Sequence, residues 1–355
     1  MKKIIVDMFG ADGGPEIVVR GAARALQAQK EYDIVLSGSS LIAQIVLQEE
    51  ASRMEISPAD LIQRVSVIET TSFVTDRENP KNMVKDRNDT SMVLALEALK
   101  EDAEIEAMVT AGNTGCALVG SCFHLGLQKG LLQPALASAL PKAGGGYALL
   151  LDCGSNLEPR PKELEQYARL GAGFVRGAYG VPSPVVGLLN VGKESKKGTE
   201  ILQEAYGKIA EAAEKGGFVF AGNVEGGDIL SGKLDVVVCD GFTGNVIIKG
   251  FESVGLFCAR LAKDREKSEG TFSLPNANAE LALRQIEDPY NRKTEDLNIP
   301  ASLAIRRSFD YNSQAGAIFI GTKKLIMKAH GAATEETICS CILQAINLCM
   351  GTSGK

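Results

Sequence analysis

Short apolar runs rich in β-branched residues recur along the chain, and most end in a glycine-containing turn that leads into an amphipathic helical segment. This order is typical of a parallel β-sheet flanked by helices. The 38 glycines, against 12 prolines, suit a fold with many tight strand-to-helix turns. We therefore predict an α/β fold. Its strands are expected at residues 3–7, 33–37, 65–69, 107–110, 148–152, 185–190, 218–221, 235–239 and 325–328.

Charge and cysteine content narrow the class of function. The 38 Lys and Arg against 44 Asp and Glu leave a net charge of −6, so the chain has no global basic field for nucleic acid or an anionic membrane. No cysteine forms a C-x-x-C pair or lies at zinc-ligand spacing from a histidine, which favours buried thiols in a reducing compartment. The N-terminus runs directly into a strand, and no stretch approaches ~18 apolar residues. We expect a soluble, cytoplasmic protein.

One segment interrupts the strand and helix pattern. Residues 263–310 are charged and polar, contain three prolines and short helical stretches such as 277–286, and show no strand-like run. The segment reads as a helical excursion from the sheet. It follows a predicted helix at 245–262, in which Phe251, Val254, Cys258 and Leu261 lie at helical spacing. Such a stripe is typical of a core or a subunit interface.

Six turns follow predicted strands, where ligands bind in parallel sheets. Their glycines let backbone N–H groups approach an anion, and a helix N-terminus adds partial positive charge. Each turn alone is equally explained as a cap or a connector, but together they favour binding of a small anion. The turns cover residues 7–15, 110–115, 152–156, 190–198, 222–228 and 240–245.

Several familiar sites are absent from the sequence. No turn reads G-x-x-x-x-G-K-[ST], no strand leads into G-x-G-x-x-G with a later acidic residue, and G-x-S-x-G does not occur. A P-loop ATPase, a Rossmann dinucleotide site and a nucleophile elbow are thereby disfavoured. Of the two histidines, His124 reads as a packed helix residue, whereas His330 lies after a strand, beside the other turns.

The turns and their flanking strands resemble the PlsX phosphate acyltransferases of bacterial membrane-lipid synthesis. The resemblance covers most of the chain except the excursion. The segments that carry it are DMFGADGGP, TSMVLALE, VTAGNTG, LLLDCGSN, GLLNVGKESKKG, AGNVEGGDI, VVVCDGFTGNVIIK and KAHG. The family usually reads D-x-M-G-G-D-x-x-P where this chain has Phe9 and Ala11, L-D-x-G-A-N where it has Ser155, and S-R-G-[ST]-S-M where residues 87–92 read RNDTSM.

This resemblance implies a three-layer α/β/α sandwich with a mainly parallel sheet, similar to the isocitrate/isopropylmalate dehydrogenase-like and phosphotransacetylase folds. Residues 1–262 and 311–355 would form the catalytic domain, and 263–310 the charged excursion. The implied reaction converts acyl-[acyl-carrier protein] and inorganic phosphate to acyl phosphate and free carrier protein, in a homodimer without metal or organic cofactor. A glycerol-3-phosphate acyltransferase at the membrane would act downstream, so peripheral membrane contact is a further expectation.

The expected roles of individual residues follow from the resemblance and from charge. Lys197 and Lys249 would hold phosphate with the turns at 110–115 and 240–245, while Asn245 and His330 would support the oxyanion or protonate the departing sulfur. These four are the candidate catalytic residues. The candidate substrate-binding residues are Asp7, Gly10, Asp12, Gly13, Thr110, Gly112, Asn113, Thr114, Gly115, Asp152, Asn156, Asn190, Gly192, Asn223, Asp240, Gly241, Thr243 and Gly244.

Two alternatives stay open at this point. A phosphotransacetylase acting on acyl-coenzyme A would share the chemistry and differ only in the donor. A non-enzymatic scaffold would bind the acidic carrier protein through the excursion, where Arg292, Lys293, Arg306 and Arg307 supply positive charge. A decarboxylating dehydrogenase would need clustered aspartates for a divalent metal, and the sequence shows no such spacing.

Overall fold

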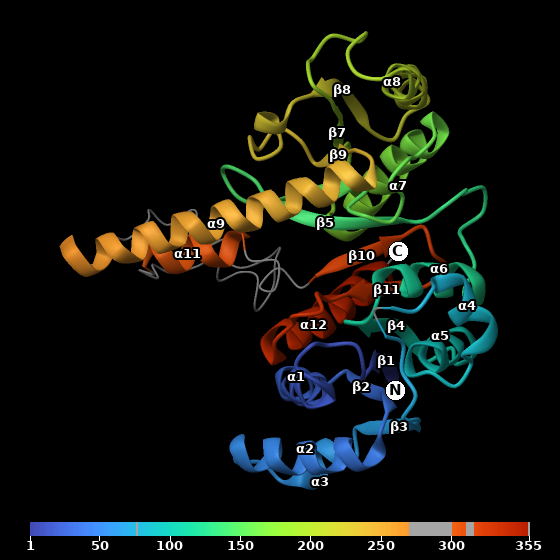
Figure 1. The fold of residues 1–355 in the computed structure, drawn as a ribbon, viewed down its shortest axis with the longest axis vertical. Coiled ribbons are helices and arrows are strands. Elements are labelled where there is room, and N and C mark those ends of the chain that lie inside the picture. Colours follow the sequence, from blue (N-terminus) through green and yellow to red (C-terminus); the bar gives the residue numbers. More distant parts are fainter. Residues whose placement is uncertain (76, 270–299, 310–315, 354–355) are drawn as a thin grey trace. The chain divides into compact units, whose positions relative to one another are not determined.

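The computed structural model describes residues 1–75, 77–269, 300–309 and 316–353 (Figure 1). The chain forms two compact units, each with its own strands and helices. Unit 1 consists of Met1–Pro134 and Ala315–Lys355, and unit 2 consists of Ala135–Gln314. Each unit is described by itself below. Among the described residues, no helix combines the length and the apolar composition that crossing a membrane requires.

The strands of unit 1 follow the order β3-β2-β1-β4-β11-β10. All pair in parallel except β10, which is antiparallel to β11. Asp7, Thr110 and Lys328 are the last residues of β1, β4 and β11, so they lie at one edge of the sheet. The strands are β1 (Lys2–Asp7), β2 (Tyr32–Gly38), β3 (Val65–Glu69), β4 (Ile105–Thr110), β10 (Ala317–Ile320) and β11 (Leu325–Lys328).

Helices cover both faces of this sheet. Figure 1 shows α1 and α12 on one face and α5 and α6 on the other. Local residues favour the start of several of these helices. Pro15 is the first residue of α1, where a backbone N–H would have no partner within the helix. The Asn113 side chain caps α6 by accepting from the Cys116 N–H at 2.9 Å. The helices are α1 (Pro15–Ala28), α2 (Ser40–Arg53), α3 (Pro58–Ile62), α4 (Pro80–Asp86), α5 (Ser91–Glu101), α6 (Thr114–His124) and α12 (Glu335–Ser353).

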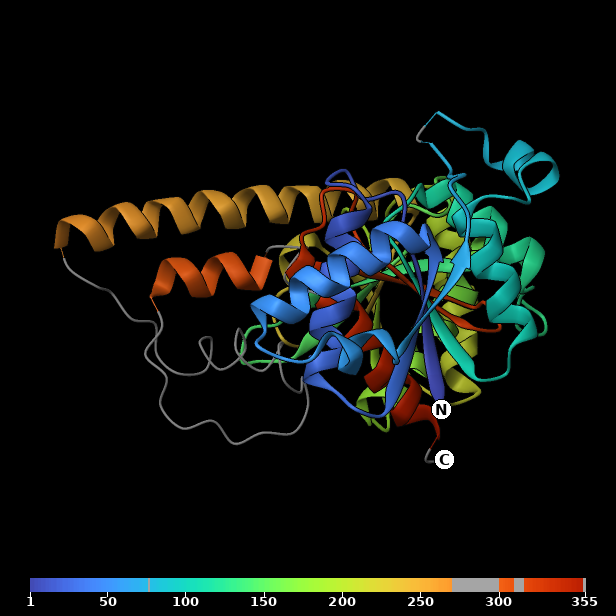
Figure 2. The same ribbon diagram turned by 90° about the horizontal axis from the view of Figure 1, so that it is seen from below.

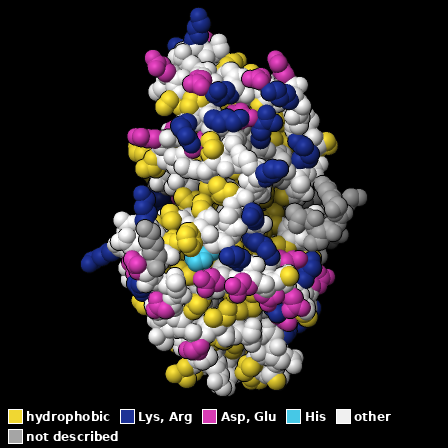
Figure 3. Space-filling model, turned by 90° about the vertical axis from the view of Figure 1, so that its right-hand side faces the viewer, with side chains coloured by type: hydrophobic (Ala, Val, Ile, Leu, Met, Phe, Trp, Pro, Cys, Tyr) yellow, Lys and Arg dark blue, Asp and Glu magenta, His cyan; other side chains and the backbone are white. Residues whose placement is uncertain are grey.

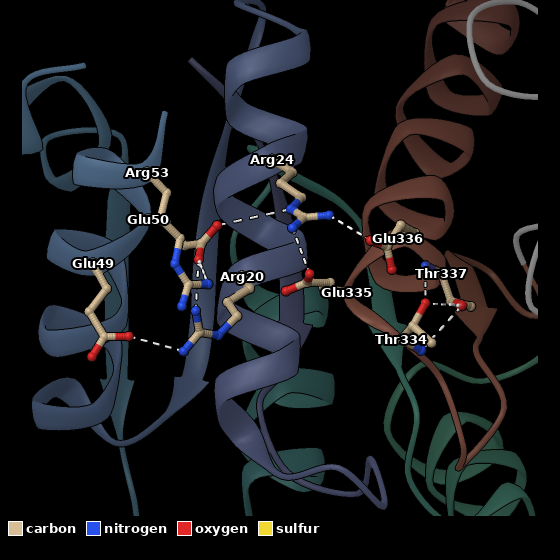
Figure 4. A network of polar contacts seen from close by, with 9 residues as sticks. All are labelled: Arg20, Arg24, Glu49, Glu50, Arg53, Thr334, Glu335, Glu336 and Thr337. Atoms are coloured by element: carbon tan, nitrogen blue, oxygen red, sulfur yellow. Dashed lines mark hydrogen bonds and ion pairs between the residues drawn. The ribbon is translucent and has the colours of Figure 1, made fainter. Parts of the chain in front are cut away.

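A polar network joins α1 to α2 and to the start of α12 (Figure 4). The buried carboxylate of Glu50 accepts from Arg20 and Arg53, each at 2.8 Å. Arg24 bridges the two sides, because it forms ion pairs with Glu335 and Glu336 and a longer one, of 3.9 Å, with Glu50. The first and last helices of the chain are thus tied together in unit 1.

Unit 2 contains strands in the order β5-β6-β9-β7-β8, all parallel except for the antiparallel pair β5 and β6. The long helix α9 projects from these strands, and α11 packs alongside it (Figures 1 and 2). The strands are β5 (Ala135–Pro141), β6 (Tyr147–Leu151), β7 (Val185–Leu189), β8 (Val219–Val224) and β9 (Val236–Val238). The helices are α7 (Pro161–Tyr179), α8 (Glu200–Glu214), α9 (Gly241–Glu269) and α11 (Ala301–Phe309), with a short 3₁₀ turn η1 at Gly226–Asp228.

The α/β class and every predicted strand are confirmed, with ends shifted by a few residues. The sequence missed β5 and β10, the two strands that pair antiparallel. Helix α9 starts at Gly241 instead of residue 245 and passes the predicted boundary at 262 to reach Glu269. Most of the expected excursion, including the stretch 277–286, lies outside the described residues. The division into a catalytic domain and an excursion therefore stays a prediction.

Candidate functional site

In unit 1, three turns meet at the edge where β1, β4 and β11 end. The backbone of Gly10, with φ of +108°, approaches Gly112 so closely that a Cβ on Gly10 would lie 2.4 Å from the Gly112 Cα. Glycine is therefore required at position 10. The Asp12 N–H donates to the Gly331 carbonyl at 2.7 Å, and the Ala329 N–H donates to the Thr110 carbonyl at 2.9 Å. The turns that were predicted to share an edge are in direct contact.

Asp7 lies beneath these turns as a buried carboxylate. Its Oδ1 accepts from the Ser91 hydroxyl at 2.6 Å and from the Phe9 N–H at 3.3 Å, and its Oδ2 accepts from the Thr110 hydroxyl at 2.8 Å. Burial raises the pKa of Asp7 to about 6, against the opposing effect of these donors and of the Lys328 charge. A side chain enclosed in this way orients the turns and does not reach a substrate.

Buried Lys328 fixes the same turn from β11. Its Nζ donates to the Ala111 carbonyl at 3.0 Å and also to the carbonyl of Ala329. The Gly112 N–H donates to the Thr110 hydroxyl oxygen at 3.0 Å. The carbonyl and the N–H of the peptide group between Ala111 and Gly112 are thus both held by side chains, which orients the turn that leads into α6.

The N-terminus of α6 carries the remaining predicted residues of this turn. Asn113 uses its side chain as the cap, whereas Thr114 and Gly115 begin the helix, whose first N–H groups have no partner within the helix. Such a terminus favours an anion. Nearby, the His330 Nδ1 accepts from the Ala332 N–H at 3.1 Å, so in the neutral ring Nε2 carries the proton and can donate.

In unit 2, the turn after β6 packs against the start of α9. A Cβ on Gly244 would lie 1.8 Å from the Asp152 carbonyl oxygen, so this contact admits only glycine. The buried Asp152 carboxylate accepts from the N–H groups of Leu136, Ser155 and Asn156, and burial raises its pKa. Gly241 donates its N–H to the Asn156 carbonyl at 2.8 Å. Asp152, Asn156, Gly241 and Gly244 form one assembly.

The turn predicted at 240–245 is in fact the first turn of α9. Asp240 precedes it and accepts from the N–H and the hydroxyl of Thr243, at 2.8 and 2.7 Å. This is a helix cap, so both side chains have a structural partner already. Asn245, whose Cβ is 4.0 Å from a Cβ built on Gly154, lies beside the Asp152 turn. Lys249 is one helical turn further along and half exposed.

Two buried asparagines shape the lysine-rich turn after β7. The Asn190 amide donates to the Lys197 carbonyl at 3.0 Å, and the Asn223 amide donates to the Glu194 carbonyl at 2.7 Å. Gly192 lies within the same turn, close to the Lys197 side chain. Lys197 is 51% exposed, and its Nζ is 3.9 Å from Glu194. The buried Oδ1 of Asn223 has no hydrogen-bond partner, which leaves an acceptor beside the turn.

Several predicted residues therefore occupy different roles from those expected. Asp7 and Asp152 are enclosed, Asp240 caps a helix, and a Cβ on Gly13 would meet the Ile17 side chain at 2.0 Å, so these four shape the turns. His124 is buried at the end of α6, as expected. Ser91, although it lies in the RNDTSM motif, and Lys328 were not among the predicted site residues. A lysine as the last residue of a strand, directly before a glycine-containing turn, is a pattern that could have indicated Lys328.

The fold defines the class to which the chain is related. A phosphotransacetylase from Streptococcus pyogenes has a similar structure, with a TM-score of 0.60 and 14% identity over 99% of this chain and 94% of that one. A 4-hydroxythreonine-4-phosphate dehydrogenase from Klebsiella pneumoniae has a TM-score of 0.53 and 14% identity over 98% of this chain and 100% of that one. At these identities the likeness concerns the fold alone, and it confirms the predicted relation to phosphotransacetylase and dehydrogenase-like folds.

The sequence comparisons identify the family. The model of a family described as "Fatty acid synthesis protein" matches residues 2–352. A phosphate acyltransferase of Shouchella clausii is 33% identical over 343 residues, which is 97% of this chain and 93% of that protein. The chain belongs to this phosphate acyltransferase family, and it is an acyltransferase enzyme, as the motifs predicted.

Proposed function

We propose that this protein transfers the acyl group of an acyl-[acyl-carrier protein] to inorganic phosphate. The phosphate oxygen attacks the thioester carbonyl, the C–S bond breaks, and the products are acyl phosphate and the free carrier thiol. The observation that carries the proposal is the turn at residues 110–115, which is held from below by Asp7 and Lys328 and leads into the N-terminus of α6. That terminus offers backbone N–H groups to an anion.

The reaction mainly requires that the reactants are positioned and that the developing negative charge is stabilised. Phosphate carries negative charge at neutral pH. The carrier thiol has a pKa of about 8.5, so its thiolate leaves readily and little proton transfer is needed. What the protein must supply is a set of donors for phosphate and for the oxyanion that forms at the thioester carbonyl. A glycine-lined helix terminus and exposed lysines are suited to that task.

We assign the individual roles as follows. Lys197 and Lys249, both about half exposed, bind phosphate. Asn245, which lies beside the Asp152 turn, donates to the oxyanion. His330, with its proton on Nε2, donates to the oxyanion or protonates the departing sulfur. Gly10, Asp12, Gly112, Asn113, Thr114 and Gly115 shape the anion-binding turns in unit 1, and Asn156, Asn190, Gly192 and Asn223 shape the turns in unit 2.

A basic stripe on α7 suits the binding of a carrier protein. Lys162, Arg169 and Arg176 are exposed at seven-residue spacing, which places them on one side of the helix. Glu165, the acidic residue that pairs with the first two, is buried. Figure 3 shows Lys and Arg side chains gathered on this part of unit 2. Carrier proteins are acidic, so the stripe is complementary to them.

The basic residues expected to bind carrier protein in a scaffold are not described by the structure. Arg292 and Lys293 lie outside the described residues, and the side chains of Arg306 and Arg307 are likewise not described. Their role in carrier binding therefore stays a prediction.

A homodimer is also part of the proposal. Of the predicted stripe on α9, Val254 and Leu261 are exposed, and so is the neighbouring Phe257. An apolar face of this kind suits a subunit interface better than a core. The acyl phosphate would then pass to a glycerol-3-phosphate acyltransferase at the membrane, to which the protein binds peripherally.

The test of the function is a donor assay. We expect phosphate-dependent release of the thiol from a long-chain acyl-[acyl-carrier protein], with acyl phosphate as the second product. Release from acetyl-coenzyme A at an equal or higher rate would favour the phosphotransacetylase alternative. Binding of carrier protein without phosphate-dependent release would favour the scaffold.

A further inference from the structure

Two aromatic rings stack at the surface of unit 1. The ring centroids of Phe9 and Phe73 are 5.3 Å apart, with an interplanar angle of 29°. Phe9 lies in the turn between β1 and α1, and Phe73 lies in the stretch between β3 and α4. Phe73 remains 43% exposed, so one apolar ring surface of the pair faces solvent. Stacked aromatic side chains that stay exposed are often binding surfaces.

The position of Phe73 is fixed by polar contacts of its own segment. Arg87 donates through Nη2 to the Ser72 hydroxyl at 3.0 Å and to the Phe73 carbonyl at 3.3 Å, and it forms an ion pair with Glu78. The Ser91 N–H donates to the Ser72 carbonyl at 2.9 Å. Figure 2 shows the stretch between β3 and α5 standing out from unit 1. Phe73 is therefore held in place and not merely packed on Phe9.

The aromatic pair adjoins the anion-binding turn. Phe9 is followed by Gly10, whose backbone touches Gly112, and the Phe9 N–H donates to Asp7. From the other side, Pro80 reaches the start of α6, since a Cβ on Gly115 would lie 3.1 Å from the Pro80 Cγ. The apolar rings and the N-terminus of α6 are thus neighbouring parts of one surface in unit 1.

The proposed substrate likewise has a polar part and an apolar part next to each other. A thioester presents a polar carbonyl, at which phosphate attacks, and the first carbons of its hydrocarbon chain follow directly. We propose that the Phe9–Phe73 pair binds the hydrocarbon chain of the acyl donor and sets the preference for chain length. This inference rests on the proposed function, because it concerns the acyl group of that donor. Contact of several methylene groups with the rings should raise the affinity for the acyl donor by roughly tenfold or more.

The test compares donors that differ only in chain length. Wild type, Phe73→Ala and Phe73→Leu are assayed with carrier protein loaded with a butanoyl or a hexadecanoyl chain. We expect Phe73→Ala to lower kcat/KM for the long chain by roughly tenfold or more and for the short chain by less than about twofold, at unchanged KM for phosphate. Phe73→Leu keeps an apolar surface and should retain most of the long-chain rate.

Phe123→Ala provides the matched control. Phe123 is 68% exposed and lies near the opposite end of α6 from the anion-binding turn, so its removal should leave the chain-length preference unchanged. An equal loss for both donors in Phe73→Ala would overturn the proposal and assign the ring to support of the turn. Unchanged kcat/KM for both donors would overturn it as well. If wild type releases no thiol from either donor, the proposed function fails, which is a distinguishable result.

Discussion

The Thr110 hydroxyl donates a 2.8 Å hydrogen bond to the Asp7 carboxylate, and both side chains are buried. The same hydroxyl accepts from the Gly112 N–H, so the charge of Asp7 is coupled to the turn that leads into α6. Burial raises the pKa of Asp7 to about 6. We expect kcat/KM for acyl phosphate formation to fall as the pH drops through this value, because a protonated carboxyl accepts hydrogen bonds less well. A rate profile from about pH 5 to about pH 8 measures this.

Stability should change in the opposite direction. Because the native pKa of about 6 exceeds the ordinary value of 3.8, the native state binds more protons than the unfolded state in this range. The stabilising contribution of Asp7 is therefore fully present below the unfolded pKa and is lost as the pH rises through the native one. Asp7→Asn should flatten this part of the stability curve, measured by urea unfolding, and should remove from the rate profile the part of the acid limb that Asp7 contributes. Phosphate, which also titrates in this pH range, affects both enzymes alike, so identical acid limbs in wild type and Asp7→Asn would contradict the assignment.

The sequence could place Asp7 at the end of a strand but could not show what its carboxylate faces. Strand ends and glycine turns are local patterns, whereas the enclosure of Asp7 depends on Ser91, which is far away in the chain. The contact of Phe73 with Phe9 is also non-local. The sequence between β3 and α4 does not indicate where that segment folds back. The strand positions and the turns after them were predictable, and the surroundings of the side chains were not.

The contact between α9 and the Asp152 turn predicts a pair of opposite effects within one helix. Gly244→Ala places a Cβ where the Asp152 carbonyl oxygen lies 1.8 Å away, which should cost about 3 kcal/mol or more of stability. Gly250→Ala, in the same helix with open space around its Cα, should instead stabilise by about 0.5 to 1 kcal/mol. Urea unfolding of both variants measures the difference. Equal effects would show that the contact is softer than the structure indicates.

The proposed anion-binding role of Lys197 can be tested separately from its neighbours. Lys197→Ala and Asn245→Ala should each lower the rate of acyl phosphate formation by on the order of a hundredfold, the contribution of one well-placed donor. Lys196→Ala is the matched control, since it removes an adjacent exposed lysine from the same turn. Values of kcat/KM for phosphate, obtained from rates at varied phosphate concentration, measure the effect. Wild-type turnover in both Lys197→Ala and Asn245→Ala would refute the assignment.

Two strands, β5 and β10, were not predicted from the sequence because neither has a long run of β-branched residues. β5 reads ALASALP, in which small side chains and a terminal proline give little β-branched character, and β10 is only four residues long. Both are antiparallel to a strand that was predicted. Both strands are nearly as buried as the parallel strands, so burial does not separate them. The rule of a β-branched run followed by a glycine turn depends on residue type and length, and β5 fails on the first and β10 on the second.

Glu49 and Glu50 both pair with Arg20 and differ in burial, which gives a clean test of the network in Figure 4. The Glu50 side chain is 1% exposed and also pairs with Arg53, whereas Glu49 is 49% exposed. Glu50→Ala should cost about 3 kcal/mol, because it leaves cations without a buried partner. Glu49→Ala should cost less than about 1 kcal/mol. Urea midpoints at constant slope measure both, and similar losses would argue against the burial effect.

The basic stripe on α7 predicts how the enzyme selects its donor. Replacing Lys162, Arg169 and Arg176 together by Glu should raise KM for acyl-[acyl-carrier protein] about tenfold or more at low salt, because the acidic carrier is then repelled. KM for phosphate should not change, and the difference should shrink at high salt.

The control for this variant carries the same change in net charge elsewhere. Lys30, Lys100 and Lys129 are exposed lysines of unit 1, and their joint replacement by Glu should leave KM for the carrier protein within about twofold of wild type. If both triple variants weaken carrier binding equally, net charge and not the stripe directs the encounter. If neither does, the carrier protein docks on another surface, and α7 has no part in recognising the donor.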